Sequence, residues 1–213
     1  MSRSAAIAVF TFLLASPVSA SSRSDLAAGY ASVLHREYDK AIALLTDAID
    51  SGDLNQRDLA LAYHWRGAEH LKKNEDGLAL ADLDRALGLD PKLATAYSDR
   101  GVAYRRLGRF ELAIADYTEA IRLWPNWHDW YVNRGLAYEA LGRHDEAIAD
   151  FTKAVFYDPQ LARGYLFRAS AYVDQNRLNE AQSDIRRAKS IKENALKDLP
   201  MLAEKFRRLG LID

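Results

Sequence analysis

Two charged residue types recur in this chain at a fixed spacing that could support chemistry. Four arginines and four aspartates each stand 34 residues apart: Arg66, Arg100, Arg134 and Arg168, and Asp82, Asp116, Asp150 and Asp184. Guanidinium groups bind anions bidentately, so such an array could form a catalytic or anion-binding site. Function rarely needs four identical copies, and we therefore interpret the array as a structural ladder of Arg–Asp pairs. Spacing alone does not decide whether each pair lies within one repeat or between two.

Other residues that carry catalysis or bind metals give little support for an enzyme. The five histidines fall at unrelated positions, and no two have the spacing of a zinc motif: His35, His64, His70, His128 and His144. The chain has no cysteine, and it lacks a phosphate-binding glycine loop and a nucleophile elbow. We therefore expect no catalytic residues, no metal ligands and no cofactor.

The elements that would position the Arg–Asp ladder follow the same period. Pro91, Pro125 and Pro159 stand 34 residues apart, and each should end a helix because the residue before a proline is pushed out of the helical region. A second column should end the preceding helix in the left-handed conformation, which Gly and Asn tolerate: Asn74, Gly108, Gly142 and Asn176. The pattern predicts an all-α protein in which one helical hairpin is copied along the chain.

The residues that carry the period resemble those of the tetratricopeptide repeat (TPR) family. The motif is clearest in the segment Tyr131-Val132-Asn133-Arg134-Gly135-Leu136-Ala137-Tyr138, followed by Ala147, Phe151, Ala154 and Pro159. Four copies are predicted over 60–93, 94–127, 128–161 and 162–193. The resemblance implies a right-handed α-solenoid whose ligand groove is lined by the first helix of each copy.

The two ends of the repeat array are less regular. Residues 22–59 form a divergent first copy with extra residues near 51–56, and Arg36 stands where other copies carry Gly or Asn. Residues 194–213 are predicted to form a capping helix that covers the last apolar face. Its apolar side consists of Leu196, Leu199, Leu202, Phe206 and Leu209. Pro200 is expected to kink it.

The N-terminus has the layout of a secretory signal peptide. Arg3 precedes an apolar run over 5–15, and Val18-Ser19-Ala20 provides small residues for cleavage after Ala20. We expect a signal peptide over 1–20 and a periplasmic or secreted TPR domain over 21–213, with no stable membrane span. An uncleaved anchor or a buried helix remains the alternative. The formal net charge of −1 argues against a general nucleic-acid binder.

The resemblance implies a set of partner-binding positions on the first helices, and these positions vary between copies. They are His64, Lys72, Ser98, Val102, Arg105, Arg106, Val132, Leu136, Glu139, Leu166 and Ser170. The Lys/Asn/Arg set that grips a free C-terminal carboxylate in some TPRs is absent. Arg105 and Arg106 make one basic spot, suited to an amphipathic or acidic peptide unless both are simply solvated.

Three tryptophans gather around one turn between copies. We expect Trp124 and Trp130 to pack into the junction and Trp127 to be exposed. Exposed tryptophans would mark a partner hot spot or a surface for stacking sugars. The main hypothesis is therefore a periplasmic adaptor that binds a protein or peptide. The alternative is a glycan- or peptidoglycan-binding module that uses Trp124–Trp130. The partner, the pathway and the oligomeric state stay open.

Overall fold

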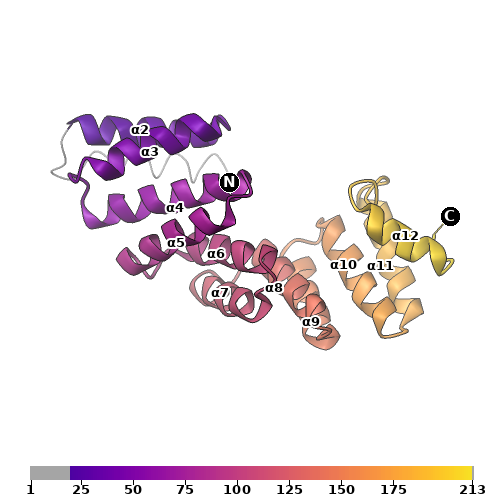
Figure 1. Cartoon of the computed structure of the whole chain (residues 1–213). Helices are drawn as coiled ribbons and strands as arrows, with labels where there is room; N and C mark the ends of the chain where they lie inside the picture. The colour runs from indigo at the N-terminus through magenta and orange to yellow at the C-terminus, as the bar shows by residue number, and fades with distance from the viewer. Residues whose placement is uncertain (1–19, 213) are drawn as a thin grey trace. The chain divides into compact units, whose positions relative to one another are not determined.

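The computed structural model describes residues 20–212, and every regular element in that range is an α-helix (Figure 1). The helices are α2 (Ala20–Leu34), α3 (Tyr38–Asp50), α4 (Gln56–Lys72), α5 (Asp76–Leu89), α6 (Ala94–Arg106), α7 (Phe110–Leu123), α8 (His128–Ala140), α9 (His144–Tyr157), α10 (Ala162–Asp174), α11 (Leu178–Ile191) and α12 (Pro200–Arg208). This confirms the prediction of an all-α array of helical repeats. The predicted signal peptide lies outside the described residues except for Ala20, where α2 begins.

The chain divides into two compact units, Met1–Leu107 and Gly108–Asp213. In the first unit, α2 packs against α3 and α4 against α5, and each hairpin contacts the helix that follows it. In the second unit, α8 packs against α9 and α10 against α11 in the same way. Each of these four hairpins therefore buries its apolar faces against itself and its neighbours in the same unit, as expected for a repeat protein.

The first helix of each hairpin ends at a residue with a left-handed backbone. Positive φ values occur at Arg36 (61°), Asn74 (60°), Gly108 (72°), Gly142 (70°) and Asn176 (57°). The predicted Gly/Asn column is therefore confirmed. Arg36 adopts the same conformation despite its side chain, which costs about 1–2 kcal/mol. The divergent first copy is thus a complete hairpin, α2 and α3.

The second helices end where the prolines predict. Asp90, Trp124 and Asp158 follow α5, α7 and α9, and their φ angles of −136°, −140° and −130° are extended, as a residue before proline requires. Lys192 follows α11 with φ −144° although Glu193 stands after it. Packing between hairpins therefore sets the geometry of this turn, and proline reinforces it.

Close contact between a small and a large residue holds each hairpin together. A Cβ on Gly135 would lie 2.6 Å from Cε1 of Phe151, and one on Gly67 would lie 3.0 Å from Cγ of Leu83. Phe151 and Leu83 are fully buried. The first and second helices therefore approach so closely that a side chain at Gly135 would displace Phe151 and one at Gly67 would crowd Leu83.

The C-terminal cap differs from its prediction. Residues 192–199 form turns, and α12 begins at Pro200, which occupies the first helical turn instead of kinking a longer helix. Phe206 is fully buried in a core cluster with Leu166 and Ile185, so α12 does cover the last hairpin. Leu209, which was expected on the buried side, is 46% exposed because α12 ends at Arg208.

Replacing Gly135 tests this packing. Gly135→Leu should lower the free energy of unfolding by about 1–3 kcal/mol, because the new side chain would overlap the fully buried Phe151 ring. Gly77→Leu is the matched control, since a Cβ at Gly77 has nothing within 4 Å. Urea denaturation measures both. Equal stability of Gly135→Leu and the parent protein would contradict the close approach.

Candidate functional site

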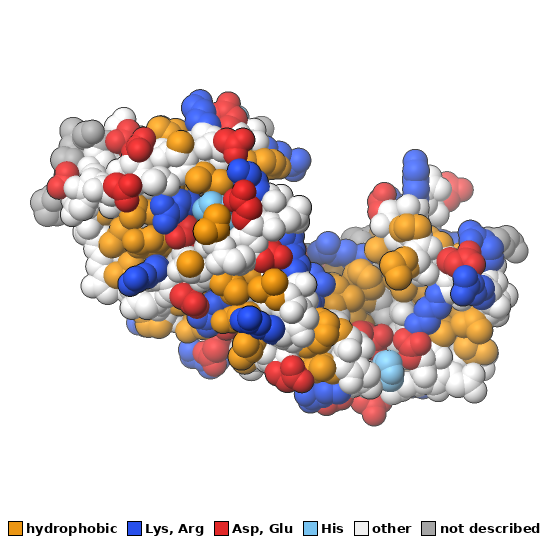
Figure 2. All heavy atoms as spheres, in the orientation of Figure 1, with side chains coloured by type: hydrophobic (Ala, Val, Ile, Leu, Met, Phe, Trp, Pro, Cys, Tyr) orange, Lys and Arg blue, Asp and Glu red, His pale blue; other side chains and the backbone are white. Residues whose placement is uncertain are grey.

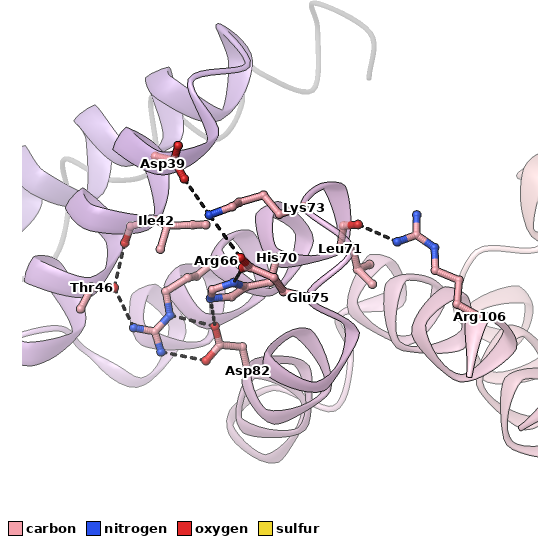
Figure 3. Close-up of polar contacts among 10 residues, drawn as sticks. All are labelled: Asp39, Ile42, Thr46, Arg66, His70, Leu71, Lys73, Glu75, Asp82 and Arg106. Carbon is pink, nitrogen blue, oxygen red and sulfur yellow. Dashed lines mark hydrogen bonds and ion pairs between the residues drawn. The ribbon is translucent and has the colours of Figure 1, made fainter. Parts of the chain in front are cut away.

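Three of the Arg–Asp pairs lie within one repeat, and each of these arginines also reaches the preceding repeat. Nε and Nη2 of Arg134 donate to the two carboxylate oxygens of Asp150 at 2.8 Å, and Nη1 donates to Oγ1 of Thr118 at 2.9 Å. The same three bonds recur in two further sets, Arg168 with Asp184 and Thr152, and Arg66 with Asp82 and Thr46. Figure 3 shows Arg66 between Asp82 and Thr46.

We call each set of arginine, aspartate and threonine a bridge, and the hydrogen bonds of the threonine explain its place in it. Oγ1 of Thr46 donates to the carbonyl of Ile42 at 2.8 Å, and Oγ1 of Thr118 donates to the carbonyl of Ile114 at 2.7 Å. The hydroxyl proton is thereby committed within the helix, and the oxygen lone pairs can accept from arginine. Where the sequence has Asp84 in this column, a carboxylate oxygen accepts from Nη1 of Arg100 at 2.6 Å.

The carboxylates of this array are structural. Asp82, Asp150 and Asp184 are only 5–6% exposed, and both oxygens of each are bound by arginine. Burial raises the pKa of Asp150 and the bonds from Arg134 oppose that shift. The guanidinium of Arg134 also lies 5.9 Å from the ring centroids of Tyr131 and Tyr138. These three pairs leave no free carboxylate for a substrate, which agrees with the predicted ladder.

The predicted binding positions on α4 are occupied by contacts within the first unit. His64 is 4% exposed, and its Nε2 lies 2.9 Å from a carboxylate oxygen of Asp99 on α6. Lys72 is exposed, but its ammonium bonds Glu69 and lies 5.6 Å from the centroid of the Tyr38 ring. Glu69 itself is fully buried. His64 therefore joins two first helices instead of facing a partner.

The positions on α6 differ from one another. Ser98 is buried, and Val102 is half-buried against the core formed around Leu83. Nη1 of Arg106 donates to the carbonyl of Leu71 at 2.6 Å, as Figure 3 shows, and also contacts Asn74 and Asp76. Arg105 is half-buried, and its Nε has no hydrogen-bond partner in the structure. The predicted basic spot is therefore reduced to Arg105, since Arg106 joins α6 to α4.

A second polar cluster in the first unit joins consecutive hairpins near the turns between their first and second helices. Nδ1 of His70 lies 2.6 Å from Oε2 of Glu75, and Lys73 bonds both Asp39 and Glu75, at 2.7 and 3.2 Å (Figure 3). The hydrogen bonds from His70 and Lys73 lower the pKa of Glu75. His70 and Lys73 are therefore bound to carboxylates of the protein itself.

The apolar binding positions of the second unit belong to its core. Val132 is 3% exposed and Leu166 is fully buried, each within a core cluster. Leu136 is half-buried and packs against the same cluster as Val132. Of these three positions, only Leu136 presents appreciable surface.

The polar positions of the second unit join four helices. Nδ1 of His144 lies 2.8 Å from Oε1 of Glu139, and the ammonium of Lys205 on α12 bonds both oxygens of Asp174 at 2.6 and 2.7 Å. Lys205 also donates to Oγ of Ser170 at 2.8 Å. Ligand atoms of Glu139, His144 and Asp174 lie within 4.8 Å of one another, a donor set that could hold a divalent cation. Lys205 already supplies a positive charge there, so the cluster is complete as an ion-pair network.

The tryptophan turn corrects one expectation. Trp130 is 4% exposed and Trp127 is 42% exposed, as predicted, but Trp124 is 57% exposed. Trp124 caps the end of α7 with an extended backbone, the position held by Asp90 and Asp158 in other copies. Asp90 and Asp158, the equivalent residues of the neighbouring copies, are charged, which already indicates that this position is not part of the apolar core.

Charged side chains of both signs are interspersed over the face shown in Figure 2. This face therefore carries no large patch of a single charge. Among residues 20–212, no helix combines the length and apolar character needed to cross a bilayer.

Comparisons with known proteins agree with this architecture. A profile of the tetratricopeptide repeat matches residues 66–127, 98–162 and 132–195. A crystal structure of MamA is similar with a TM-score of 0.70 and 24% sequence identity, over 79% of this chain and 96% of that chain. A structure of MamA residues 41 to the end from Desulfovibrio magneticus RS-1 has a TM-score of 0.75 and 15% identity, over 83% of this chain and 98% of that chain. A search of curated proteins found no match.

Titration of Glu139 should be visible in stability. Burial raises its pKa above the ordinary 4.5, Asp174 adds to the shift, and His144 and Lys205 oppose it. Above pH 4.5 the folded state then binds this proton more tightly than the unfolded state does. The contribution of Glu139 to the free energy of unfolding therefore falls as the pH rises through its pKa in the folded state. The stability of the parent protein relative to Glu139→Gln should therefore decrease from pH 4 towards neutral in urea titrations.

Glu146 provides a control of opposite sign. It is exposed, and the hydrogen bond from Arg143 lowers its pKa below 4.5. Its contribution to the free energy of unfolding is present above pH 4.5 and is lost as the pH falls through its pKa in the folded state. The stability of the parent protein relative to Glu146→Gln should therefore increase from low pH towards neutral. Parallel curves for the parent protein and Glu139→Gln would contradict the assignment.

Proposed function

Because the chain belongs to the tetratricopeptide repeat family, we propose that it is an adaptor that binds a protein or peptide through the first helices of its repeats and acts in the bacterial periplasm. The proposal includes no catalytic role. The ionisable groups that recur from copy to copy are bound to one another, as in the pair of Arg134 and Asp150.

The observation that supports this proposal is a difference between two kinds of repeat position. Positions that hold alanine in every regular copy are buried and pack the helices together, whereas some positions on the first helices vary between copies and are not fixed by the packing. The alanines that recur on the second helices, Ala79, Ala113, Ala147 and Ala181, are fully buried. On the first helices, by contrast, the column that holds Arg105 holds Glu139 in the next copy. The fold does not require a particular residue at such a position, so that position is free to be selected by a partner.

Arg105 is the side chain best placed for partner binding in the first unit. Arg105 is a half-buried residue whose Nε is buried without a hydrogen-bond partner, whereas neighbouring Arg106 is bound to the carbonyl of Leu71. Buried polar groups without a partner are rare and call for an explanation. A carboxylate from an acidic or amphipathic segment would pair with this guanidinium group by a charge-assisted bond.

The proposed location rests on the sequence of the N-terminus. The short apolar run over 5–15 and the small residues before Ser21 are typical of a cleaved secretory signal. The absence of cysteine from the whole chain favours the periplasm over a eukaryotic secretory route. Sequencing the N-terminus of protein recovered from its host should find Ser21 first, and an intact Met1 would contradict export.

A matched pair of arginine variants tests the binding surface. Partners are first identified by crosslinking the exported protein in its host, and their affinity is then measured by titration. Arg105→Gln should weaken binding roughly 3- to 10-fold, about 0.7–1.4 kcal/mol, and reduce its dependence on salt. Arg122→Gln is the control, because Arg122 is exposed on the second helix α7 and contacts Glu119.

Arg105→Gln should change the free energy of unfolding little, since most substitutions away from the core do so. The proposal is wrong if Arg105→Gln and Arg122→Gln bind every crosslinked partner as the parent protein does. Equal loss in both variants would instead indicate non-specific attraction of charge, and would also contradict binding through the first helices.

A further inference from the structure

The turn between α7 and α8 presents two tryptophans to solvent. Trp124 and Trp127 are 57% and 42% exposed, their ring centroids lie 6.3 Å apart, and their planes differ by 17°. The imidazole of His128 continues the arrangement, since it lies 6.0 Å from Trp127 at an interplanar angle of 7°. Three aromatic rings of one short segment are therefore close to parallel.

The scaffold beneath this segment holds it in place. Trp130 is 4% exposed, and its ring lies 6.1 Å from that of Trp124 with planes 25° apart. The hydroxyl of Tyr131 donates to the carbonyl of Pro125 at 2.7 Å and fixes the middle of the turn. Tyr131 is itself buried, which together with Tyr157 raises its pKa to about 12. The exposed indoles are thus presented by an ordered turn, so little conformational entropy is lost when a ligand binds.

Polar side chains of fixed position border the aromatic rings. Nη2 of Arg163 donates to Oδ1 of Asp129. Nδ1 of His128 lies 2.9 Å from the same oxygen, and its Nε2 lies 3.8 Å from Asp158. Asp129 and Arg163 are each at least one-third exposed at their side chains, 34% and 50%. The border therefore offers both acceptors and donors.

We propose that the turn Trp124–Trp130 binds an oligosaccharide. The negative face of an indole attracts the polarised C–H groups on the flat side of a pyranose ring. Hydroxyl groups both donate and accept, so they match a border that combines a carboxylate with a guanidinium. This surface consists of the turn between α7 and α8 and the first turns of α8 and α10, and it does not include Arg105 of α6.

Other ligands fit the arrangement less well. A cage for a quaternary ammonium group needs rings that enclose the cation, and nearly parallel rings do not enclose one. An apolar peptide would cover the indoles but would form no hydrogen bonds with the charged border of Asp129 and Arg163. A neutral polyhydroxylated ligand uses both parts of the surface.

Indole N–H signals in a proton–nitrogen NMR spectrum test the proposal directly. The chain has four tryptophans, of which Trp65 and Trp130 are buried. The probes are hexasaccharides of β-1,4-linked N-acetylglucosamine, β-1,4-linked glucose and α-1,4-linked glucose, and an apolar hexapeptide. We expect at least one saccharide to shift the signals of Trp124 and Trp127 saturably, with smaller shifts of Trp65.

Variants identify the groups that bind. Trp127→Ala and Trp124→Ala should each weaken saccharide binding about tenfold or more, as truncation of an aromatic anchor does. Phe156→Ala is the matched control, because Phe156 is an aromatic residue of the same unit with 71% exposure. Asp129→Asn keeps the side-chain shape and leaves the indoles unchanged, so it tests the polar border even if a tryptophan variant folds poorly. Arg105→Gln should bind saccharide normally.

Three results would overturn the proposal. The first is that no saccharide shifts the two exposed indoles at millimolar concentration. The second is that the peptide shifts them and the saccharides do not, which would assign the turn to a protein partner. The third is that Phe156→Ala weakens binding as much as Trp127→Ala, which would show that any exposed aromatic residue has the same effect.

Discussion

The bridge of arginine, aspartate and threonine is the interaction on which the rest of the structure depends. In three copies it joins three helices; in one of them Thr118 lies on α7, Arg134 on α8 and Asp150 on α9. Its carboxylates are buried, and removing one member of a buried ion pair costs about 3–5 kcal/mol, since the other charge is left without a partner. The bridge therefore fixes the register between consecutive hairpins, while contacts of a glycine with a large apolar residue, such as Gly135 with Phe151 and Gly67 with Leu83, set the distance between the two helices of a hairpin.

This division of roles explains where function can reside. Many of the side chains that hold the hairpins together recur from copy to copy, and these are buried or bound to one another. The positions that differ from copy to copy lie on the first helices and in the turns between copies. Arg105 and the exposed tryptophans of the turn before α8 are examples, and neither is required by the repeated packing. A repeat protein can therefore change its ligands while keeping its core.

The sequence predicted the fold well because each helix end is encoded locally. In the three copies over 60–161, a Gly or Asn marks the end of the first helix and a proline marks the end of the second, and both can be read from one sequence. The candidate site was harder to predict, since it depends on contacts between copies. Arg106 reaches the carbonyl of Leu71 and Lys205 reaches Ser170, and in each case the partner lies 35 residues away on another helix. Trp124 could have been placed correctly, because Asp90 and Asp158 share its column.

A double-mutant cycle on Arg134 and Asp150 tests the central claim most directly. Arg134→Met and Asp150→Leu should each lower the free energy of unfolding by about 3–5 kcal/mol, because each leaves a buried charge unpaired. The double variant removes both charges, so it should lose much less than the sum, with a coupling energy of about 1–3 kcal/mol or more. Single losses below about 1 kcal/mol that simply add in the double variant would show that the bridge does not hold the repeats together.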